Sequence, residues 1–279
     1  MQNATQIDRA RAFRDLHDRR RILLLPNAWD AGSARLFEQR GFAAIATTSG
    51  GLAWSLGYAD GEQAPLADVL AAVARITRVV ELPVTVDIET GYGDTPEAVA
   101  ATVHAVIAAG AAGINIEDGR PGHGPLRAVD EAVTRLRAAR AAADASGVPI
   151  VINARVDHWM QHGDTDAQVR FNDAVHRARA YLDAGADCIY PIGLSAPGVL
   201  ARLVQSIDAP INVAAGAGMP DLVELGRLGI ARVSTATRLA TLALGAVDHA
   251  VRGMLETGRF DGLSADFTYA DAQRLFMPQ

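Results

Sequence analysis

The sequence predicts a closed (β/α)8 barrel, and three observations support this. Short apolar segments, each long enough for one buried strand, alternate along the chain with helical segments rich in Ala, Arg and Leu. There are eight such strand segments, which is the number that a closed barrel of this type requires. No Gly-x-Gly-x-x-Gly sequence follows the first strand, so the alternative of a doubly wound open sheet lacks the glycine turn that would support it.

The predicted strands are, in order, Ile22–Pro26, Ala43–Thr47, Val84–Asp87, Gly113–Glu117, Ile150–Arg155, Asp187–Pro191, Ile211–Ala214 and Ala231–Thr235. The helical patterns between them include Pro65–Val80, Pro96–Ala109, Val129–Ala145 and Val169–Ala184. Glycine follows the predicted helix ends, as in Ala109–Ala111 and Ala184–Asp187, because it readily adopts the left-handed backbone that ends a helix.

Two segments lie outside the eight units. A helix at Gln6–His17, within residues 1–21, should cap the bottom of the barrel. The tail from Gly258 to Gln279 is amphipathic, with Phe267 and Phe276 among its apolar residues, so it needs a surface to cover. No low-complexity linker divides the chain, and we therefore expect residues 1–279 to form a single domain.

Composition excludes several classes of function. Apolar residues make up 49% of the 279, and the net charge of −6 contains no long run of either sign, which argues against nucleic-acid or membrane partners. All 26 basic residues are arginines, which excludes lysine Schiff-base aldolases, pyridoxal-phosphate enzymes and P-loop nucleotidases. The N-terminus has no apolar secretory signal, and the single cysteine, Cys188, precludes an intramolecular disulfide, so we expect a cytoplasmic protein.

The strongest functional signal is the segment Pro83–Gly93, in which a buried strand runs into two carboxylates and a glycine turn. Alternation along the strand places Asp87 and Glu89 on the same side. Because unpaired buried charge is costly, a cation should meet these carboxylates. Oxygen ligands favour Mg2+, with Mn2+ as an alternative, and no His or Cys cluster has the spacing of a zinc site.

Further polar residues follow the neighbouring strands, and the active sites of such barrels form at the C-terminal ends of the strands. The Thr47–Gly51 segment can direct amide donors at an oxyanion, and Arg155 can grip a carboxylate with two hydrogen bonds. Glu117 and Asp60 add carboxylates from two other strand ends. These groups together describe a site for a 2-oxo acid whose enolate must be stabilised.

Other polar or reactive residues near these strands are interpreted as structural. Asp118 and Asp157 are predicted to be solvated loop acids, and Cys188 to be a core thiol. Gly216–Gly218 follows the seventh strand, where some barrels bind phosphate, but no basic side chain is nearby in the sequence. A plain loop is therefore predicted there.

Jointly these segments resemble the isocitrate lyase/phosphoenolpyruvate mutase superfamily over nearly the whole chain, from Leu24 to Leu239. The segments that carry the resemblance are Thr48–Gly50, Leu56–Asp60, Asp87–Gly93, Asn115–Asp118 and Asn153–Arg155. The resemblance implies that Asp87 binds Mg2+ directly. It further implies that the waters of that ion are held by Asp60, Glu89 and Glu117.

The resemblance also implies substrate contacts and an assembly. Ser49 and neighbouring amides would bind the oxygen atoms of the 2-oxo acid, with Asn212 at its distal part; Tyr190 and Arg238 are further candidates for the distal pocket. The expected substrate-binding residues are thus Thr47, Thr48, Ser49, Gly50, Asp87, Arg155, Asn212, Tyr190 and Arg238. The expected catalytic residues are Asp60, Arg155 and His123. Members of the superfamily exchange their last helix between paired subunits and form tetramers, which would give the tail near Phe267 and Phe276 a partner surface.

Departures from the superfamily pattern bear on the reaction. Isocitrate and methylisocitrate lyases carry a Lys-x-Cys-Gly-His lid with a proton-donating cysteine, whereas Gly119–Pro125 of this chain contains neither Cys nor Lys. Those lyases also have a glutamate after the proline of strand six, where this chain has Ile192. The lysine and asparagine that the mutase and phosphonopyruvate hydrolase subgroup carries in its lid are missing as well.

The remaining groups fit decarboxylation of an oxaloacetate-like 2-oxo acid, which needs an enolate sink and a proton at C3. His123 is the only side chain of the lid that can donate a proton near neutral pH. Two alternatives stay open. One is cleavage of a methylisocitrate-like C–C bond or a phosphonopyruvate C–P bond, and the other is a non-catalytic protein that binds a 2-oxo acid such as 2-oxoglutarate or oxalate.

Overall fold

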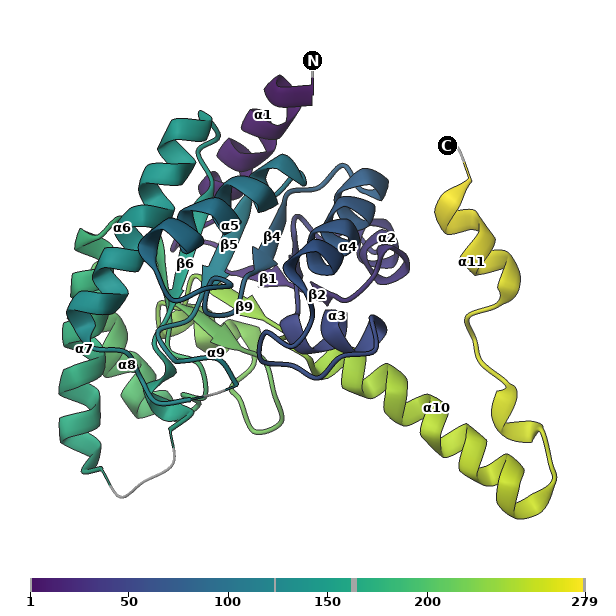
Figure 1. Ribbon diagram of the computed structural model, residues 1–279. Helices are drawn as coiled ribbons and strands as arrows, with labels where there is room; N and C mark the ends of the chain where they lie inside the picture. The colour runs from purple at the N-terminus through teal and green to yellow at the C-terminus, as the bar shows by residue number, and fades with distance from the viewer. Residues whose placement is uncertain (1, 123, 162–164, 278–279) are drawn as a thin grey trace.

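The computed structural model describes residues 2–122, 124–161 and 165–277, and the chain forms a parallel β-barrel surrounded by helices (Figure 1). The strands are β1 (Leu23–Leu25), β2 (Asn27–Ala28), β3 (Ile45–Thr47), β4 (Val84–Asp87), β5 (Gly113–Ile116), β6 (Val151–Arg155), β7 (Cys188–Tyr190), β8 (Asn212–Ala214) and β9 (Arg232–Ser234). Strands β2 to β7 pair in sequence order, and β1, β9 and β8 form a second parallel group.

The two groups of strands join into one closed barrel. Pro26, which has no amide hydrogen, is the only residue between β1 and β2, so these two strands form one interrupted barrel strand. A parallel bridge between Ile189 and Ile211 connects β7 to β8 at the other junction. The prediction of an eight-stranded (β/α)8 barrel is confirmed, and each predicted strand is found within two residues of its predicted ends.

The helices are α1 (Gln2–Asp15), α2 (Ala31–Gln39), α3 (Ser49–Ser55), α4 (Leu66–Val79), α5 (Pro96–Ala108), α6 (Val129–Ser146), α7 (Ala167–Asp183), α8 (Pro197–Ser206), α9 (Leu222–Arg227), α10 (Arg238–Thr257) and α11 (Tyr269–Phe276), with 3-10 turns η1 (Asp157–Trp159) and η2 (Asp261–Leu263). Their boundaries follow local sequence: Thr95 caps α5 ahead of Pro96, and Gly147, with φ 71°, ends α6. Helix α4 buries Val69, Val73 and Ile76 on one stripe.

The barrel interior contains a polar network beneath the C-terminal ends of the strands. Asn153 Nδ2 of β6 donates to Asn115 Oδ1 of β5 at 2.8 Å, and Arg232 Nη2 of β9 reaches the same oxygen at 3.2 Å. Strands β5 and β9 are not sheet neighbours, so the latter contact crosses the barrel. At the bottom, helix α1 covers the starts of the strands, with buried Phe13 stacked 5.8 Å from the Arg232 guanidinium.

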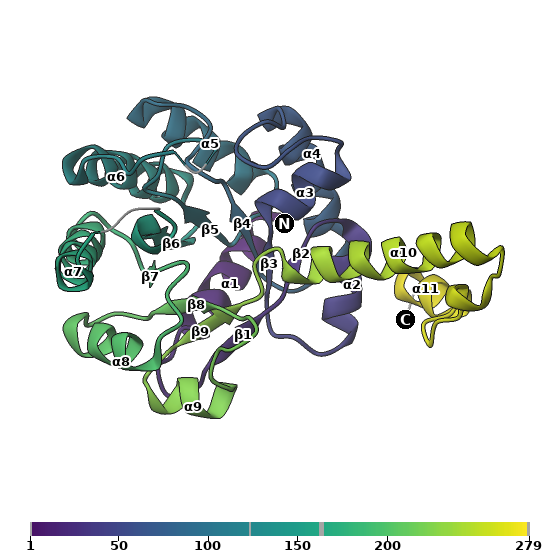
Figure 2. The same cartoon turned by 90° about the horizontal axis from the view of Figure 1, so that it is seen from below.

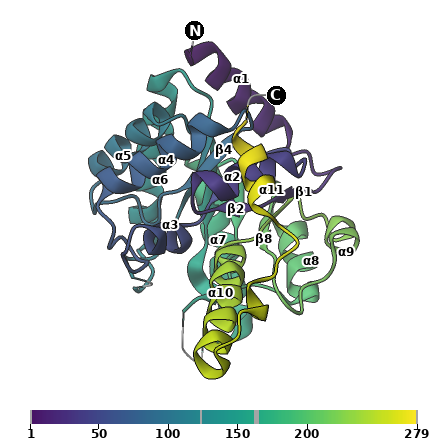
Figure 3. The same ribbon diagram turned by 90° about the vertical axis from the view of Figure 1, so that its right-hand side faces the viewer.

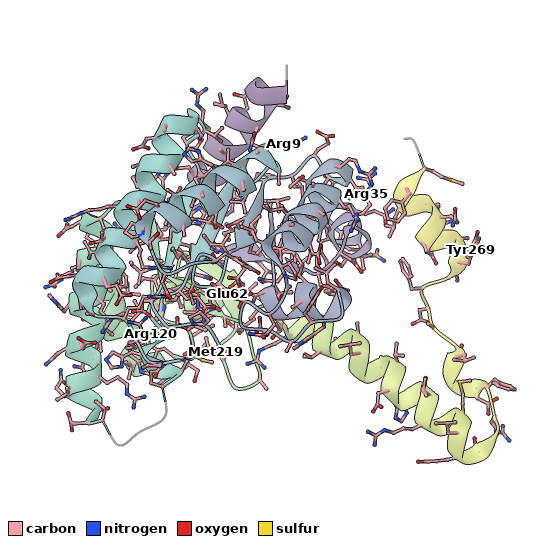
Figure 4. All side chains as sticks on the ribbon, viewed as in Figure 1. Arg9, Arg35, Glu62, Arg120, Met219 and Tyr269 are labelled. Carbon is pink, nitrogen blue, oxygen red and sulfur yellow. The ribbon has the colours of Figure 1, made fainter. Side chains whose placement is uncertain are left out.

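Helix α10 leaves the barrel instead of packing on it, as Figures 2 and 3 show. Ala240 is the only buried residue of this helix. The segment after it returns toward the same chain, where Leu275 of α11 is buried and its carbonyl accepts a 2.6 Å hydrogen bond from Arg35 Nε of α2 (Figure 4). The tail, expected to cover a partner, therefore packs in part on its own subunit, while Phe267 and Phe276 stay exposed. No helix within the described residues is long and apolar enough to cross a membrane.

Candidate active site

A pocket of about 190 Å3 opens at the C-terminal ends of the strands. We call its acid-rich side the acidic half, which consists of Asp60, Asp87, Glu89 and Glu117. We use the name distal half for six uncharged residues of the lining, namely Met160, Tyr190, Ile192, Ser234, Ala236 and Thr237. Arg155, Thr48 and Ser49 also line it. A wider groove of about 810 Å3 lies at the other end of the barrel, but its Arg9 and Glu81 pair with each other, and no acidic cluster faces it.

Asp87 occupies the end of β4 and is held by backbone and side-chain contacts. Its amide donates to Thr47 Oγ1 at 2.9 Å, and its Oδ1 accepts from the Glu89 amide at 3.1 Å. Burial raises the pKa of Asp87, as does the Asp60 carboxylate, while Arg155 and the amide of Ser49 oppose this. Thr47 thus touches Asp87 without lining the pocket.

Glu89 reaches the pocket from a turn and not from the strand. Strand β4 ends at Asp87, and the φ of Glu89, 50°, lies in the left-handed region. The alternation argument that placed both carboxylates on one strand face is therefore wrong, although both line the same pocket. Burial and then the nearby Asp87 charge raise the pKa of Glu89 to about 7.

Arg155 lies at the end of β6 and is buried between two carboxylates. Its Nε and Nη2 donate to Asp157 at 3.1 and 2.7 Å, and its Nη1 donates to Glu117. Burial opposes the charge of the guanidinium, but Asp157 and Glu117 outweigh burial and hold the pKa of Arg155 well above its usual range. These bonds use three of the five N–H groups of the guanidinium.

The prediction that Asp118 and Asp157 are solvated loop acids is wrong. Both are buried, because each has a partner that compensates its charge. Asp118 accepts from Tyr181 OH at 2.6 Å and pairs with Arg177 of α7 at 3.2 Å, and its Oδ1 accepts from the Asp157 amide at 2.9 Å. Asp157 in turn orients Arg155. The one sequence signal for this chain of contacts is the two-residue spacing of Arg155 and Asp157.

Several predicted substrate contacts fall outside the pocket lining. Asn212 is fully buried below it, with its Oδ1 accepting from Ser234 Oγ at 3.2 Å. Arg238 is exposed at the start of α10 and covers Gly216, where a Cβ would come within 2.7 Å of its Nη2, so the Gly216–Gly218 loop does have a basic neighbour. Gly50 lies behind Asp60, whose Oδ2 would be 3.1 Å from a Cβ at that position. His123 lies outside the described residues.

Tyr190 does line the pocket, as predicted, and its pKa is raised by burial. Most of the distal half was not anticipated from the sequence. Apart from Tyr190 of β7 and Ser234 of β9, it consists of loop residues, and none of its residues carries a charge, so it lacks the sequence patterns that identify metal ligands or ion pairs.

The donor set fits a divalent cation. Asp60 Oδ1 is buried and lacks a hydrogen-bond partner within the described residues, and burial raises the pKa values of Asp87, Glu89 and Glu117. A bound cation would satisfy the orphaned oxygen and offset this burial of negative charge. No three His, Cys, Asp or Glu side chains in residues 2–122, 124–161 and 165–277 already form a metal-binding cluster. Mg2+ bound in a protein usually keeps several of its waters.

Comparisons with known proteins agree with this geometry. Residues 13–255 match the family model described as phosphoenolpyruvate phosphomutase. The 2-methylisocitrate lyase of Escherichia coli is 36% identical over 210 residues, which cover 72% of this chain and 68% of that protein. The crystal structure of 2,3-dimethylmalate lyase superposes with a TM-score of 0.82 and 28% identity, covering 96% of this chain and 94% of the other.

A crystal structure of oxaloacetate acetylhydrolase superposes similarly, with a TM-score of 0.83 and 25% identity over 95% of this chain and 93% of the other. The family model spans most of the sequence, and the lyase similarity covers more than two thirds of both chains. The chain therefore belongs to the phosphoenolpyruvate mutase family, within the isocitrate lyase/phosphoenolpyruvate mutase superfamily.

Proposed function

We propose that this protein is a Mg2+-dependent lyase that acts on a small 2-oxo acid through an enolate, with decarboxylation of an oxaloacetate-like substrate as its reaction. One observation carries the proposal: the pocket joins an acidic half to a distal half without charge, and among the described residues Arg155 is the only cationic side chain in its lining. The names of the relatives, which include oxaloacetate acetylhydrolase and lyases of substituted malates and citrates, support the same class of substrate.

The acidic half would hold the metal, with Asp87 as the direct ligand and Asp60, Glu89 and Glu117 around it. When bound there, Mg2+ supplies Lewis-acid polarisation of the 2-oxo group, a contribution of several kcal/mol to transition-state stabilisation. The Arg155 guanidinium, fixed by Asp157, would bind the substrate C1 carboxylate with its remaining N–H groups. Thr48 and Ser49 line the same side and would orient the substrate oxygens.

The distal half explains why decarboxylation is favoured. We infer that a substrate held by Arg155 directs its second carboxylate toward Ile192 and Met160. Among the described residues, no cationic side chain other than Arg155 lines the pocket there. An anion that loses its solvent without gaining a partner is destabilised, whereas the departing CO2 is neutral. Tyr190 belongs to this half and stays protonated because burial raises its pKa, so its hydroxyl can donate the proton that C3 needs.

The same observation disfavours the rival substrates. A tricarboxylic methylisocitrate or a doubly charged phosphonate would bring more negative charge into a pocket where the described lining residues include one arginine. A non-catalytic 2-oxo acid binder would share the acidic half, so activity has to decide between the two.

The deciding assay follows oxaloacetate loss against uncatalysed decay, with Mg2+ and with chelator. We expect chelator-sensitive turnover that Asp87→Ala abolishes. Cys188→Ala is the matched control, because this thiol is buried in β7, and burial raises its pKa to about 12. Rates equal to background in every condition would reject the reaction, and a thermal shift with Mg2+ plus oxalate under those conditions would favour the binding protein.

We also propose that two copies assemble through α10. The stripe Leu244, Val247, Val251 and Leu255 has helical spacing and is exposed, with Leu255 82% accessible. Because α10 departs from the barrel after β9 (Figure 2), its exposed stripe can pack against the α10 of a second copy. A helix-exchanged dimer, and a tetramer as a dimer of such dimers, would bury both surfaces.

A further inference from the structure

The turn that carries Glu89 has an unusual backbone. Four of its five residues have φ in the left-handed region: Glu89 at 50°, Gly91 at 105°, Tyr92 at 54° and Gly93 at 150°. Glycine adopts such values easily, but Glu89 and Tyr92 carry a Cβ and do so only where surrounding contacts hold them. The position of the Glu89 carboxylate therefore depends on whatever holds this turn.

Glu62 holds the turn from the neighbouring loop, between α3 and α4. Its Oε1 accepts three hydrogen bonds, from the Thr90 amide at 2.9 Å, Thr90 Oγ1 at 2.6 Å and the Tyr92 amide at 3.1 Å. In return, the Glu62 amide donates to Glu89 Oε2 at 2.7 Å. Figure 4 places Glu62 among the crowded loops beside the strands. The contact is therefore reciprocal, since one carboxylate fixes the turn and the backbone of the same residue fixes the other carboxylate.

Arg135 of α6 grips the same turn through its carbonyl groups. Its Nη1 donates to the Asp94 carbonyl at 2.6 Å, and its Nη2 donates to the Thr90 carbonyl. The side chain is buried. Glu62 thus accepts from three donors of the turn, while Arg135 binds the carbonyl of Thr90 within it and that of Asp94 directly after it. These contacts leave the turn little freedom to relax.

We propose that Glu62 is a positioning residue that holds the turn of residues 89–93, and thereby Glu89, in the geometry needed to bind a divalent cation. This inference rests on the proposed metal site and assigns a role to a residue that does not line the pocket. Glu62 places a further carboxylate beside an already acidic site. Repulsion between these negative charges is unfavourable, so the hydrogen bonds of Glu62 must account for its position. All three of its side-chain bonds to the turn use one oxygen, so its action is that of a hydrogen-bond acceptor.

Two variants of Glu62 distinguish a role as hydrogen-bond acceptor from a role of its charge. Glu62→Gln keeps an acceptor oxygen of the same reach and removes the charge, whereas Glu62→Ala removes both. If Glu62 acted through its charge, the two variants would weaken cation binding alike. Gln63→Ala is the matched control, because the exposed Gln63 of the same loop donates only to the carbonyl of Gly61 among the bonds found.

Two readouts test the proposal on the full-length protein, namely Mg2+ affinity by calorimetry and amide hydrogen exchange of residues 89–93 in chelator. Glu62→Ala should raise the Mg2+ Kd by about tenfold or more and speed exchange of the turn, as loss of an outer-shell partner does in other metal sites. Glu62→Gln should change the Kd by less than about threefold, and Gln63→Ala should leave both readouts unchanged. Thr90→Val, which removes one donor from the other side of the contact, should shift both readouts in the direction of Glu62→Ala.

Introducing Glu62→Ala into a Glu89→Gln protein should give no further loss of affinity, because Glu62 acts through Glu89. Equal weakening by the Gln and Ala variants, or unaltered exchange in Glu62→Ala, would overturn the assignment. Failure of the parent protein to bind Mg2+ would overturn it together with the metal site. Intact Mg2+ binding without turnover of oxaloacetate would remove only the proposed reaction.

Discussion

Replacing Glu89 by glutamine should stabilise the metal-free protein while weakening its binding of Mg2+. Burial, followed by the charges of Asp87 and Asp60, raises the pKa of Glu89 from 4.5 to about 7. A carboxyl whose pKa is higher in the folded state binds protons more tightly there, so its ionisation opposes folding. Protonated Glu89 therefore makes its full contribution to the free energy of unfolding below about pH 4.5. That contribution is lost as the pH rises through about 7.

The size of this change in stability follows from the difference between the two pKa values of Glu89, 4.5 and about 7. Each pKa unit corresponds to about 1.4 kcal/mol, so full ionisation of Glu89 costs about 3 kcal/mol above pH 7. Glutamine keeps the shape and an acceptor for the Glu62 amide but has no charge to desolvate. We expect the free energy of unfolding of the variant to exceed that of the parent by up to about 3 kcal/mol at pH 8, and by much less at pH 5.

Urea unfolding followed by tryptophan fluorescence, in chelator at pH 5 and pH 8, measures the difference. The matched control is Glu97→Gln, which removes an exposed carboxylate in the first turn of α5, away from the pocket. Mg2+ should stabilise the parent more than the Glu89→Gln variant, because the cation binds the ionised carboxylate. A variant that is less stable than the parent at pH 8 without metal, or a difference of equal size at both pH values, would refute the reasoning.

Three further outcomes follow from the site and the assembly. Asp157→Asn should raise the KM for the 2-oxo acid about tenfold with a smaller effect on kcat in steady-state kinetics, because it loosens the charged bonds that orient Arg155; a fall in kcat alone would contradict this. Ile192→Arg should tighten binding of dicarboxylate inhibitors yet slow CO2 release by at least about tenfold, since it would stabilise the carboxylate that must leave; faster release would count against the proposed role of the distal half. Leu244→Arg with Leu255→Glu should shift the sedimentation of the protein toward the monomer, and an unchanged profile would exclude α10 as the interface.

The barrel could be predicted because its evidence is local. A parallel strand buried on both faces reads as a short apolar run, and each predicted run is a strand in the structure. The convergence of Asp87, Glu117 and Arg155 could be predicted for the same reason, since strand ends of a barrel face one opening. The backbone geometry of the turn at residues 89–93 could not be predicted in this way, because no local sequence pattern indicates it. Glu89 enters through left-handed backbone that a strand argument excludes.

Burial of charge was the other feature that local reading missed. Asp118 looks like a loop acid beside Glu117, but Arg177 and Tyr181 of α7, some sixty residues farther along the chain, make its burial favourable. Only the folded structure brings these partners together. The same holds for Glu62, whose three bonds to the turn of residues 89–93 join two loops that are separate in sequence.

The charge balance of the pocket also dictates the order in which ligands bind. Four carboxylates face one guanidinium, and that guanidinium already pairs with Glu117 and Asp157. An anionic 2-oxo acid that approaches the metal-free pocket at pH 8 thus meets net negative charge, and only a divalent cation reverses the local field. Calorimetry should therefore detect pyruvate or oxalate binding in Mg2+ and none in chelator. Equal binding in both would mean that Arg155 suffices to hold the acid, and that the carboxylates of the acidic half serve another purpose.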